Sequence, residues 1–219
     1  MGELLRLERA VYLSAEKRRV INGVSFCLSE GERCAIYGPS QSGKAALMRL
    51  CAGLTKPDDG AVYWEGQPVE TYRGIFAAVL SKNPGLMEEL TLLENAALPL
   101  LLSGKKRQRA LSAARELFEA MGMEAYMERK PSRASLLQRR ATCLARAVIT
   151  KPRIYLADCF FAGLGSKDAE KLWDFCMRRM PSQSMAFLLL TDDMAEAERM
   201  SAHYTLREGR LEKRDGDKH

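Results

Sequence analysis

The segment from Gly38 to Ala45 has the residue types and spacing that suit phosphate binding. It reads Gly-Pro-Ser-Gln-Ser-Gly-Lys-Ala and lies between an apolar stretch and a predicted helix at 44–51. Glycines let backbone N–H groups converge on phosphate oxygens, a helix N-terminus adds a favourable partial charge, and a lysine adds a full one. The frame G-x-x-x-x-G-K therefore predicts a phosphate-binding loop. The candidate nucleotide contacts are Gly38, Pro39, Ser40, Gln41, Ser42, Gly43, Lys44, Ala45 and Ala46.

The rest of the sequence predicts an α/β fold that holds this loop. Apolar runs predict early strands at 4–8, 20–28, 33–37, 61–64 and 75–80. A capping box at 91–94 and apolar residues at helical spacing predict a helical middle, with helices at 109–121 and 136–149. Strands at 154–157, 185–190 and 203–207 then alternate with helices at 166–180 and 194–200. This alternation predicts a mostly parallel sheet covered by helices, and we interpret 212–219 as a frayed polar tail.

Length and composition restrict the class of protein. A chain of 219 residues with 47% apolar residues suits one domain with a sizeable core. A net charge of +6 is only mildly basic, so nucleic acid is not expected as a partner. The six cysteines and two histidines lack metal-ligand spacing, which predicts reduced thiols in the cytoplasm. No apolar run is long enough to cross a bilayer, so any membrane role would come through a partner.

Several segments resemble, in order, the ATP-binding subunits of ABC transporters. They are INGVSFCLSEGERCAIYGPSQSGKAALMRLCAGLTKPDDGAVYWEG, ELTLLENAALPLL, LARAVITKPRIYLAD and REGRL. The chain is most similar to subunits of the lipoprotein-release and macrolide-export type, which carry an ENVALPL feature. The resemblance implies a P-loop NTPase (RecA-like) core with an N-terminal antiparallel β portion. It also implies one nucleotide-binding domain over 1–219, with a helical signature subdomain inserted at about 84–149.

The resemblance assigns roles to positions, and most of the catalytic positions carry a different residue here. Ala45 replaces the hydroxyl residue that binds Mg²⁺, and Lys82 stands at the glutamine-loop position. The Walker B aspartate is present as Asp158, where it would hold a metal weakly and indirectly. The catalytic glutamate that should follow is Cys159, and the switch histidine is Asp192.

Two further sets of positions follow from the same resemblance. The signature Leu-Ser-Gly-Gly-Gln/Glu falls on Ala134, Ser135, Leu136, Leu137 and Gln138. Its serine survives, but leucines replace both glycines that allow a close backbone approach to phosphate. The aromatic residue that stacks on adenine would be Tyr12, although Ser14 is equally placed.

These departures predict a subunit that binds ATP or ADP with little or no hydrolysis. Mg²⁺ is expected to contribute little, because two of its ligands are replaced. The family's partners are an integral membrane permease and a second ATPase subunit in a homodimer or heterodimer. Such a protein would be cytoplasmic and peripheral at the inner face of the cell membrane. Two alternatives stay open: an active ATPase that energises transport, and an interaction or regulatory subunit that works without nucleotide.

Two surface segments are candidates for contacts with a membrane or its proteins. The residues near 82–90 are expected to border a groove that accepts a short helix of the permease. The basic run at 105–109, Lys-Lys-Arg-Gln-Arg, fits a solvated face, and the alternative is contact with anionic lipid headgroups.

Overall fold

The chain folds into two compact units that alternate along the sequence. The computed structural model describes residues 2–72, 76–179 and 185–213. The first unit contains Met1–Val79, Arg153–Cys159 and Gln183–His219, and the second contains Leu80–Pro152 and Phe160–Ser182. The helical insert expected at about 84–149 lies within the second unit. That the whole chain acts as one nucleotide-binding domain stays a prediction.

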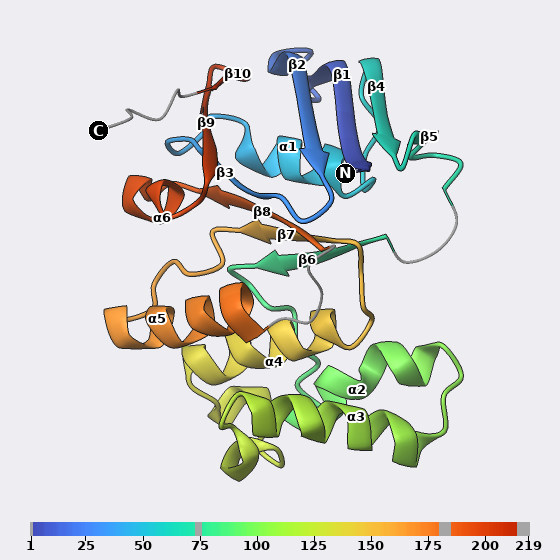
Figure 1. Ribbon diagram of the computed structural model, residues 1–219, viewed down its shortest axis with the longest axis vertical. Coiled ribbons are helices and arrows are strands. Elements are labelled where there is room, and N and C mark those ends of the chain that lie inside the picture. Colours follow the sequence, from blue (N-terminus) through green and yellow to red (C-terminus); the bar gives the residue numbers. More distant parts are fainter. Residues whose placement is uncertain (1, 73–75, 180–184, 214–219) are drawn as a thin grey trace. The chain divides into compact units, whose positions relative to one another are not determined.

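The first unit is built on two sheets (Figure 1). The four-stranded sheet has the order β2-β1-β4-β5, with strands β1 (Glu3–Leu13), β2 (Arg19–Ser29), β4 (Asp59–Trp64) and β5 (Gln67–Pro68). All of its pairings are antiparallel. The second sheet has the order β10-β9-β3-β8-β7-β6. Its strands are β3 (Arg33–Tyr37), β6 (Ala77–Ser81), β7 (Ile154–Asp158), β8 (Ala186–Thr191), β9 (Ala202–Arg207) and β10 (Arg210–Lys213).

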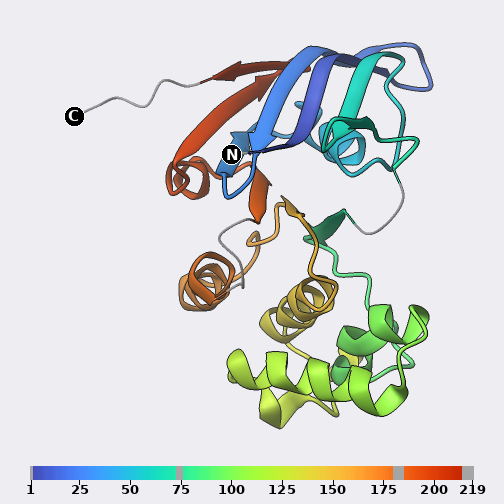
Figure 2. The same ribbon diagram turned by 45° about the vertical axis from the view of Figure 1, so that its right-hand side comes forward.

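The centre of the second sheet is parallel, so its strand ends gather at one edge. Strands β9, β3, β8 and β7 run parallel, and β10 closes an antiparallel hairpin with β9. Helix α1 (Lys44–Cys51) packs between the two sheets (Figure 2). Apolar residues of both sheets and of α1 form one core, including Leu7, Leu28, Leu47 and Leu188. The predicted α/β fold, with its antiparallel N-terminal portion, is confirmed.

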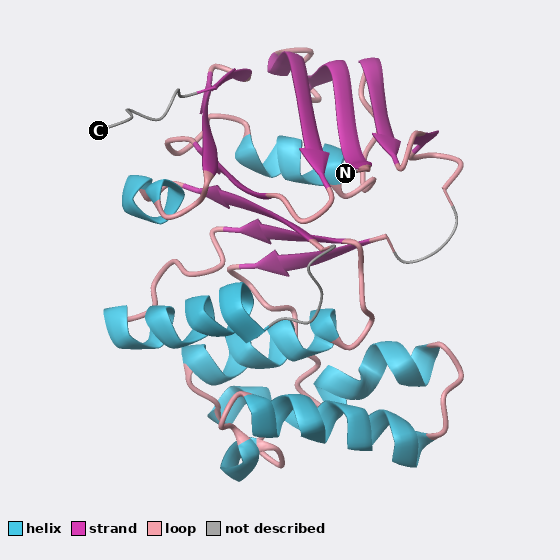
Figure 3. Cartoon of the chain, in the orientation of Figure 1, coloured by secondary structure: helices cyan, strands magenta, loops and turns pink. Residues whose placement is uncertain are grey.

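The second unit is predominantly helical (Figure 3). Its α-helices are α2 (Leu92–Leu102), α3 (Arg107–Ala120), α4 (Leu136–Val148) and α5 (Ser166–Asp174). Short 3-10 turns lie at Glu124–Tyr126 and Pro131–Arg133, and α5 continues into a π-helical turn at Phe175–Arg179. Within the described ranges, every helix is too short or too polar to cross a bilayer.

The structure confirms most predicted elements and corrects some boundaries. Strand 33–37 and helix 44–51 match β3 and α1, and the capping box opens α2. The expected polar tail is partly wrong, because Glu212 and Lys213 pair with β9 in β10. Helix α6 (Met194–Glu198) ends two residues earlier than predicted. The helix predicted at 166–180 changes to π geometry after Asp174, and its last residue lies outside the described part.

Candidate functional site

The phosphate loop connects β3 to α1 in the first unit, and its glycines are required by geometry. Gly43 has a φ of 103°, and a Cβ built there would lie 2.7 Å from the carbonyl oxygen of Val20. A Cβ on Gly38 would clash with the side chain of Ser42. The N–H of Gly38 donates to the carbonyl of Thr191 at 3.0 Å, which ties the loop to the end of β8. Gly43 therefore has to be glycine, whereas a side chain at Gly38 would require the Ser42 side chain to move.

Hydrogen-bond donors converge in this loop. Lys44 is buried, and its ammonium donates to the carbonyls of Gly38 and of Pro39, the latter at 2.9 Å. The hydroxyl of Ser42 is buried and, among the described residues, finds no hydrogen-bond partner. Gly43 is the N-cap residue of α1 and has no side chain that could accept a hydrogen bond from the helix. In α1, which the structure describes in full, the first turn carries no acidic residue. A helix N-terminus with a hydroxyl and an ammonium beside it suits an anion such as phosphate.

A surface depression of about 470 Å³ borders the loop and includes two residues that the sequence analysis missed. Arg207 and Glu208 line it together with Tyr37 and residues 39–42. Arg207 ends β9, so the β9–β10 turn brings a cation and, in Glu208, a carboxylate to the depression. The sequence showed only a hairpin in this segment, because the order of the strands in the sheet decides what the turn approaches.

The ends of β7 and β8 bring three of the predicted catalytic positions together. Asp158 ends β7 in register with Leu190 of β8, and the N–H of Cys159 donates to the carbonyl of Leu190 at 2.8 Å. Burial raises the pKa of the Cys159 thiol, and the carboxylates of Asp192 and Asp158 raise this pKa further. The ammonium of Lys44 opposes these effects but does not reverse them. The Cys159 side chain is therefore a neutral thiol at physiological pH.

The turn after β8 places Asp192 on the surface. Thr191 is buried, and its hydroxyl donates to Glu196 at 2.6 Å while it accepts the N–H of Asp193 at 3.1 Å. The carboxylate of Asp193 accepts the N–H of Ala195 at 2.9 Å and so caps α6. Burial raises the pKa of Glu196. Asp192 itself is exposed, so its carboxylate faces solvent at the position of the expected histidine.

The signature segment forms a closed helix N-terminus in the second unit. The Ser135 hydroxyl accepts the N–H of Gln138 at 3.2 Å, and the Gln138 side chain accepts the N–H of Ser135 at 3.0 Å. This capping box opens α4, and Leu136 and Leu137 occupy its first two positions. The capping box satisfies the N–H groups of Ser135 and Gln138, and leucines stand at the two positions between them, where the family has glycines.

The segment after Cys159 is packed inward. Phe160 and Phe161 are buried with ring centroids 5.3 Å apart, and Phe161 lies 5.0 Å from the ring of Trp173. The buried guanidinium of Arg140 donates to the carbonyls of Phe160 and Ala162. Arg140 thereby connects α4 to residues 160–162 within the second unit. This phenylalanine pair therefore packs within the second unit.

Two predicted site residues lie outside the loop and the strand ends described above. Lys82 is exposed and belongs to the second unit. Tyr12 lies in β1 opposite Ile21, and its half-buried ring packs against the core of the first unit. The hydroxyl of Ser14 donates to Glu16 at 2.8 Å. The expected adenine contact at Tyr12 stays a prediction.

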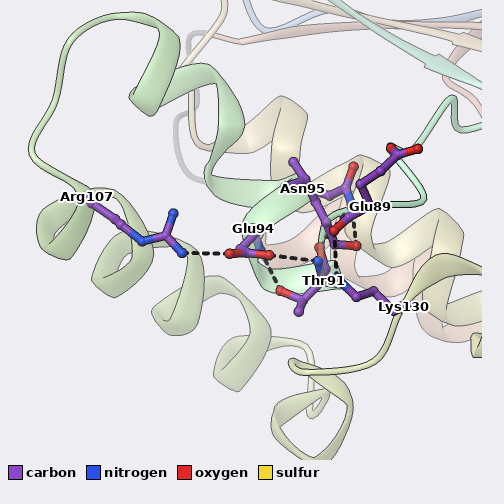
Figure 4. A network of polar contacts seen from close by, with 7 residues as sticks. Glu89, Thr91, Glu94, Asn95, Arg107 and Lys130 are labelled. Atoms are coloured by element: carbon purple, nitrogen blue, oxygen red, sulfur yellow. Dashed lines mark hydrogen bonds and ion pairs between the residues drawn. The ribbon is translucent and has the colours of Figure 1, made fainter.

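The segment 84–91 is held in place by side chains of the second unit (Figure 4). The fully buried amide of Asn95 donates to the carbonyls of Met87 and Thr91 at 2.9 Å and accepts the N–H of Met87 at 2.8 Å. Lys130 donates to the carbonyl of Glu89 at 2.6 Å, and Arg146 donates to that of Gly85 at 2.9 Å. The side chain of Met87 nevertheless remains 47% exposed.

Comparison with known proteins gives the family. The model of the ABC transporter family matches residues 21–160, more than half of the chain. The dimeric ATP-binding cassette MJ0796, in a post-hydrolysis state bound to ADP and Pi, has a TM-score of 0.86 and 24% identity, over 97% of this chain and 100% of that one. The protein cbiO1 from Clostridium perfringens, part of the ABC transporter complex cbiONQ, has a TM-score of 0.85 and 16% identity, over 96% and 87%. The fold and loop are those of a P-loop nucleotide-binding cassette, and the chain belongs to the ABC transporter family.

The family implies Mg²⁺ beside the nucleotide, and the side chains present here do not fit it well. Mg²⁺ favours hydroxyl, carboxylate and water oxygens in octahedral geometry. Ala45 offers only a methyl group at the start of α1. The cradle suits phosphate better than it suits the metal.

Proposed function

We propose that this chain is the nucleotide-binding subunit of an ABC transporter-type complex and that it binds ATP or ADP with little or no hydrolysis. The observation that carries the proposal is the thiol of Cys159. It follows the Walker B aspartate, where the family places its catalytic glutamate, and the two neighbouring carboxylates disfavour its ionisation. A neutral thiol is a poor proton acceptor, and a general base typically contributes ~10²–10⁴-fold to a rate.

Binding and hydrolysis place different demands on this site. Binding uses the backbone N–H groups of the loop, the helix N-terminus and Lys44, all of which are present. Hydrolysis also needs a metal that bridges the β- and γ-phosphates, a positioned water and a base. Ala45, Cys159 and Asp192 replace three of the groups that would serve these steps. The loop therefore keeps the groups that bind nucleotide, and the replaced residues favour very slow hydrolysis.

Phosphate release by the purified chain is the direct test. We expect a rate far below the usual enzyme median of ~10 s⁻¹, measured over hours with excess ATP. Calorimetric titration of ATP into the same sample shows that the chain is competent to bind. Steady-state release near that median would favour the active ATPase, and absence of ATP binding would favour the nucleotide-independent interaction subunit.

The same proposal includes an integral membrane permease as partner. Three side chains fix the segment 84–91 while Met87 stays exposed, so this segment is a preformed surface in the second unit. We assign to it the docking of a short permease helix, at the inner face of the cell membrane. The ENAALPLL sequence supports the lipoprotein-release or macrolide-export type, and a second ATP-binding subunit completes the assembly.

Site-specific crosslinking tests the permease contact. A photoreactive residue in place of Met87 should trap an integral membrane protein in native membranes. The same residue in place of Leu54, which is also exposed but lies in the first unit, is the matched control. Crosslinks to soluble nucleoprotein alone, or equal trapping from both positions, would reject the assignment.

A further inference from the structure

The connection between α2 and α3 in the second unit presents an apolar surface. From Ala96 to Leu102 the sequence of α2 contains no polar side chain. Residues 98–101 are only half-buried, and Leu102 is 79% exposed. The last turn and a half of α2 therefore exposes leucine on several sides, where a solvated helix end normally carries polar residues. We call residues 98–109 the α2–α3 tip; it includes the turn that follows α2 in Figures 1 and 2.

The same tip carries a concentration of positive charge. Lys105, Lys106 and Arg109 are exposed immediately after the leucines. The sequence from Asn95 to Arg115 contains five basic residues and no acidic one. The nearest carboxylate on α2, Glu94, is engaged by Arg107 at 2.6 Å (Figure 4). Lys105, Lys106 and Arg109 thus lie beside exposed leucines, and the sequence around them has no acidic residue that could neutralise their charge.

The Glu94–Arg107 pair also fixes the tip in its shape. Glu94 closes the capping box of α2 by accepting the N–H of Thr91 at 2.9 Å, and its other oxygen binds Arg107 in the first turn of α3. The Arg107 pair and the capping box share one carboxylate, so the start of α3 is tied to the start of α2. The exposed leucines and lysines are consequently held on a defined hairpin rather than on a loose loop.

We propose that the α2–α3 tip binds the surface of an anionic membrane, with Leu102 inserted at the level of the headgroups and the lysines facing their phosphates. Exposed leucine beside Lys and Arg is the combination that interfacial segments use, because apolar burial and attraction to anionic lipid add together. Charge complementarity selects anionic lipid over neutral lipid. The exposed leucines favour a membrane over nucleic acid, because binding to nucleic acid phosphates would use the cations and leave the leucines exposed to water. This contact goes beyond the proposed function, since it requires neither nucleotide nor permease.

Vesicle co-sedimentation of the full chain tests the charge component. The parent should bind phosphatidylcholine vesicles that contain phosphatidylglycerol and should bind pure phosphatidylcholine vesicles weakly. The triple variant Lys105→Gln, Lys106→Gln and Arg109→Gln should lose roughly 100-fold in partitioning, since each basic residue contributes about fivefold near an anionic surface. The matched control neutralises the exposed Lys17, Arg18 and Arg19 of the first unit, which removes the same charge. Equal binding to both lipids, or equal loss in both triple variants, would overturn the proposal.

The leucine component has its own matched pair. Leu102→Ser should weaken partitioning roughly tenfold, through lost apolar burial. Leu54→Ser, at a leucine 63% exposed in the first unit, should change it little. Thermal unfolding of each variant checks that the fold is kept. We expect it to be kept, because both leucine side chains are exposed and contribute little to the core. An unaffected Leu102→Ser variant, or binding of the tip to single-stranded DNA with none to vesicles, would contradict the proposal. The vesicles contain no permease, so this result is independent of the crosslinking test.

Discussion

Two segments of this protein lead into helices in opposite ways. The phosphate loop enters α1 through Gly43, which has a left-handed backbone. In this part of the described structure, no side chain accepts a hydrogen bond from the first N–H groups of the helix. The signature segment enters α4 through Ser135, whose hydroxyl accepts the N–H of Gln138 while the Gln138 side chain accepts the N–H of Ser135. The first helix start carries no side-chain acceptor, whereas the second has two of its N–H groups engaged by its own side chains.

The difference shows which parts of a nucleotide site survive when side chains change. Phosphate recognition in the loop depends on glycine geometry and on one lysine, and both are kept. The contribution of a signature segment depends on glycines that let its backbone approach phosphate, and Leu136 and Leu137 have taken their places. Under the proposed function, such a chain would hold a nucleotide in its own loop and offer little to the site of a partner.

The largest expected effect tests the open helix start. Lys44→Ala should weaken ATP binding by at least ~100-fold, because a full charge and a hydrogen-bond donor are lost beside phosphate. Calorimetric titration measures the change. Lys56→Ala, which removes an exposed lysine of the same unit, should bind as the parent does. Equal affinities for parent and Lys44→Ala would mean that the loop does not bind nucleotide.

The next effect concerns the closed helix start. Ser135→Ala should reduce the free energy of unfolding by ~1 kcal/mol, the usual contribution of an N-cap side chain, and leave ATP affinity unchanged. Urea unfolding checks the first part and calorimetry the second. Thr91→Ala removes the hydroxyl of the other capping box, at α2, and should give a similar loss. A drop in nucleotide affinity in Ser135→Ala would show that this serine serves the site as well as the helix.

A smaller effect is expected from the metal. ATP affinity should be similar with EDTA and with excess Mg²⁺, because Ala45 and Lys82 replace two of the metal's ligands. If the Lys82 ammonium takes over part of the metal's charge, Lys82→Gln should bind ATP a few-fold more weakly. At ~4 Å and an effective dielectric near 20, the attraction between an ammonium and a phosphate charge is ~4 kcal/mol. The cost of removing both charges from water cancels most of this attraction, so only a few-fold effect is expected. A strong Mg²⁺ requirement in the parent, or unchanged binding by the variant, would disprove this idea.

The smallest effect is expected from restoring one catalytic side chain. Cys159→Glu should release phosphate no faster than Cys159→Ser, because a new carboxylate beside Asp158 and Asp192 meets like charges and still lacks its metal and signature partners. Single-turnover phosphate release compares the two variants. Vigorous hydrolysis by Cys159→Glu would show that the site lacks only its base.

The sequence allowed much of the fold and half of the site to be predicted. The phosphate loop was recognisable because its requirements are local: a strand, two glycines at a fixed spacing and a helix. The roles of Asp158, Cys159 and Asp192 were expectations from the family resemblance, and the structure places these residues at the ends of neighbouring strands β7 and β8. Arg207 could not be foreseen, because it reaches the loop only through the position of β9 beside β3. The capping function of Ser135 was hidden because the same residues match a family motif.

The hydrogen bonds of Lys44 have a consequence for the affinity of the loop. Its ammonium donates to the carbonyls of Gly38 and Pro39, so a phosphate must take the lysine away from its own loop. The affinity observed is then the intrinsic affinity multiplied by the fraction of molecules with the lysine released. Side-chain rotamer changes are fast compared with nucleotide encounter, so the release of this lysine lowers the affinity and does not limit the rate of binding. A nucleotide has to offer phosphate oxygens in exchange for two backbone carbonyls that already satisfy the ammonium.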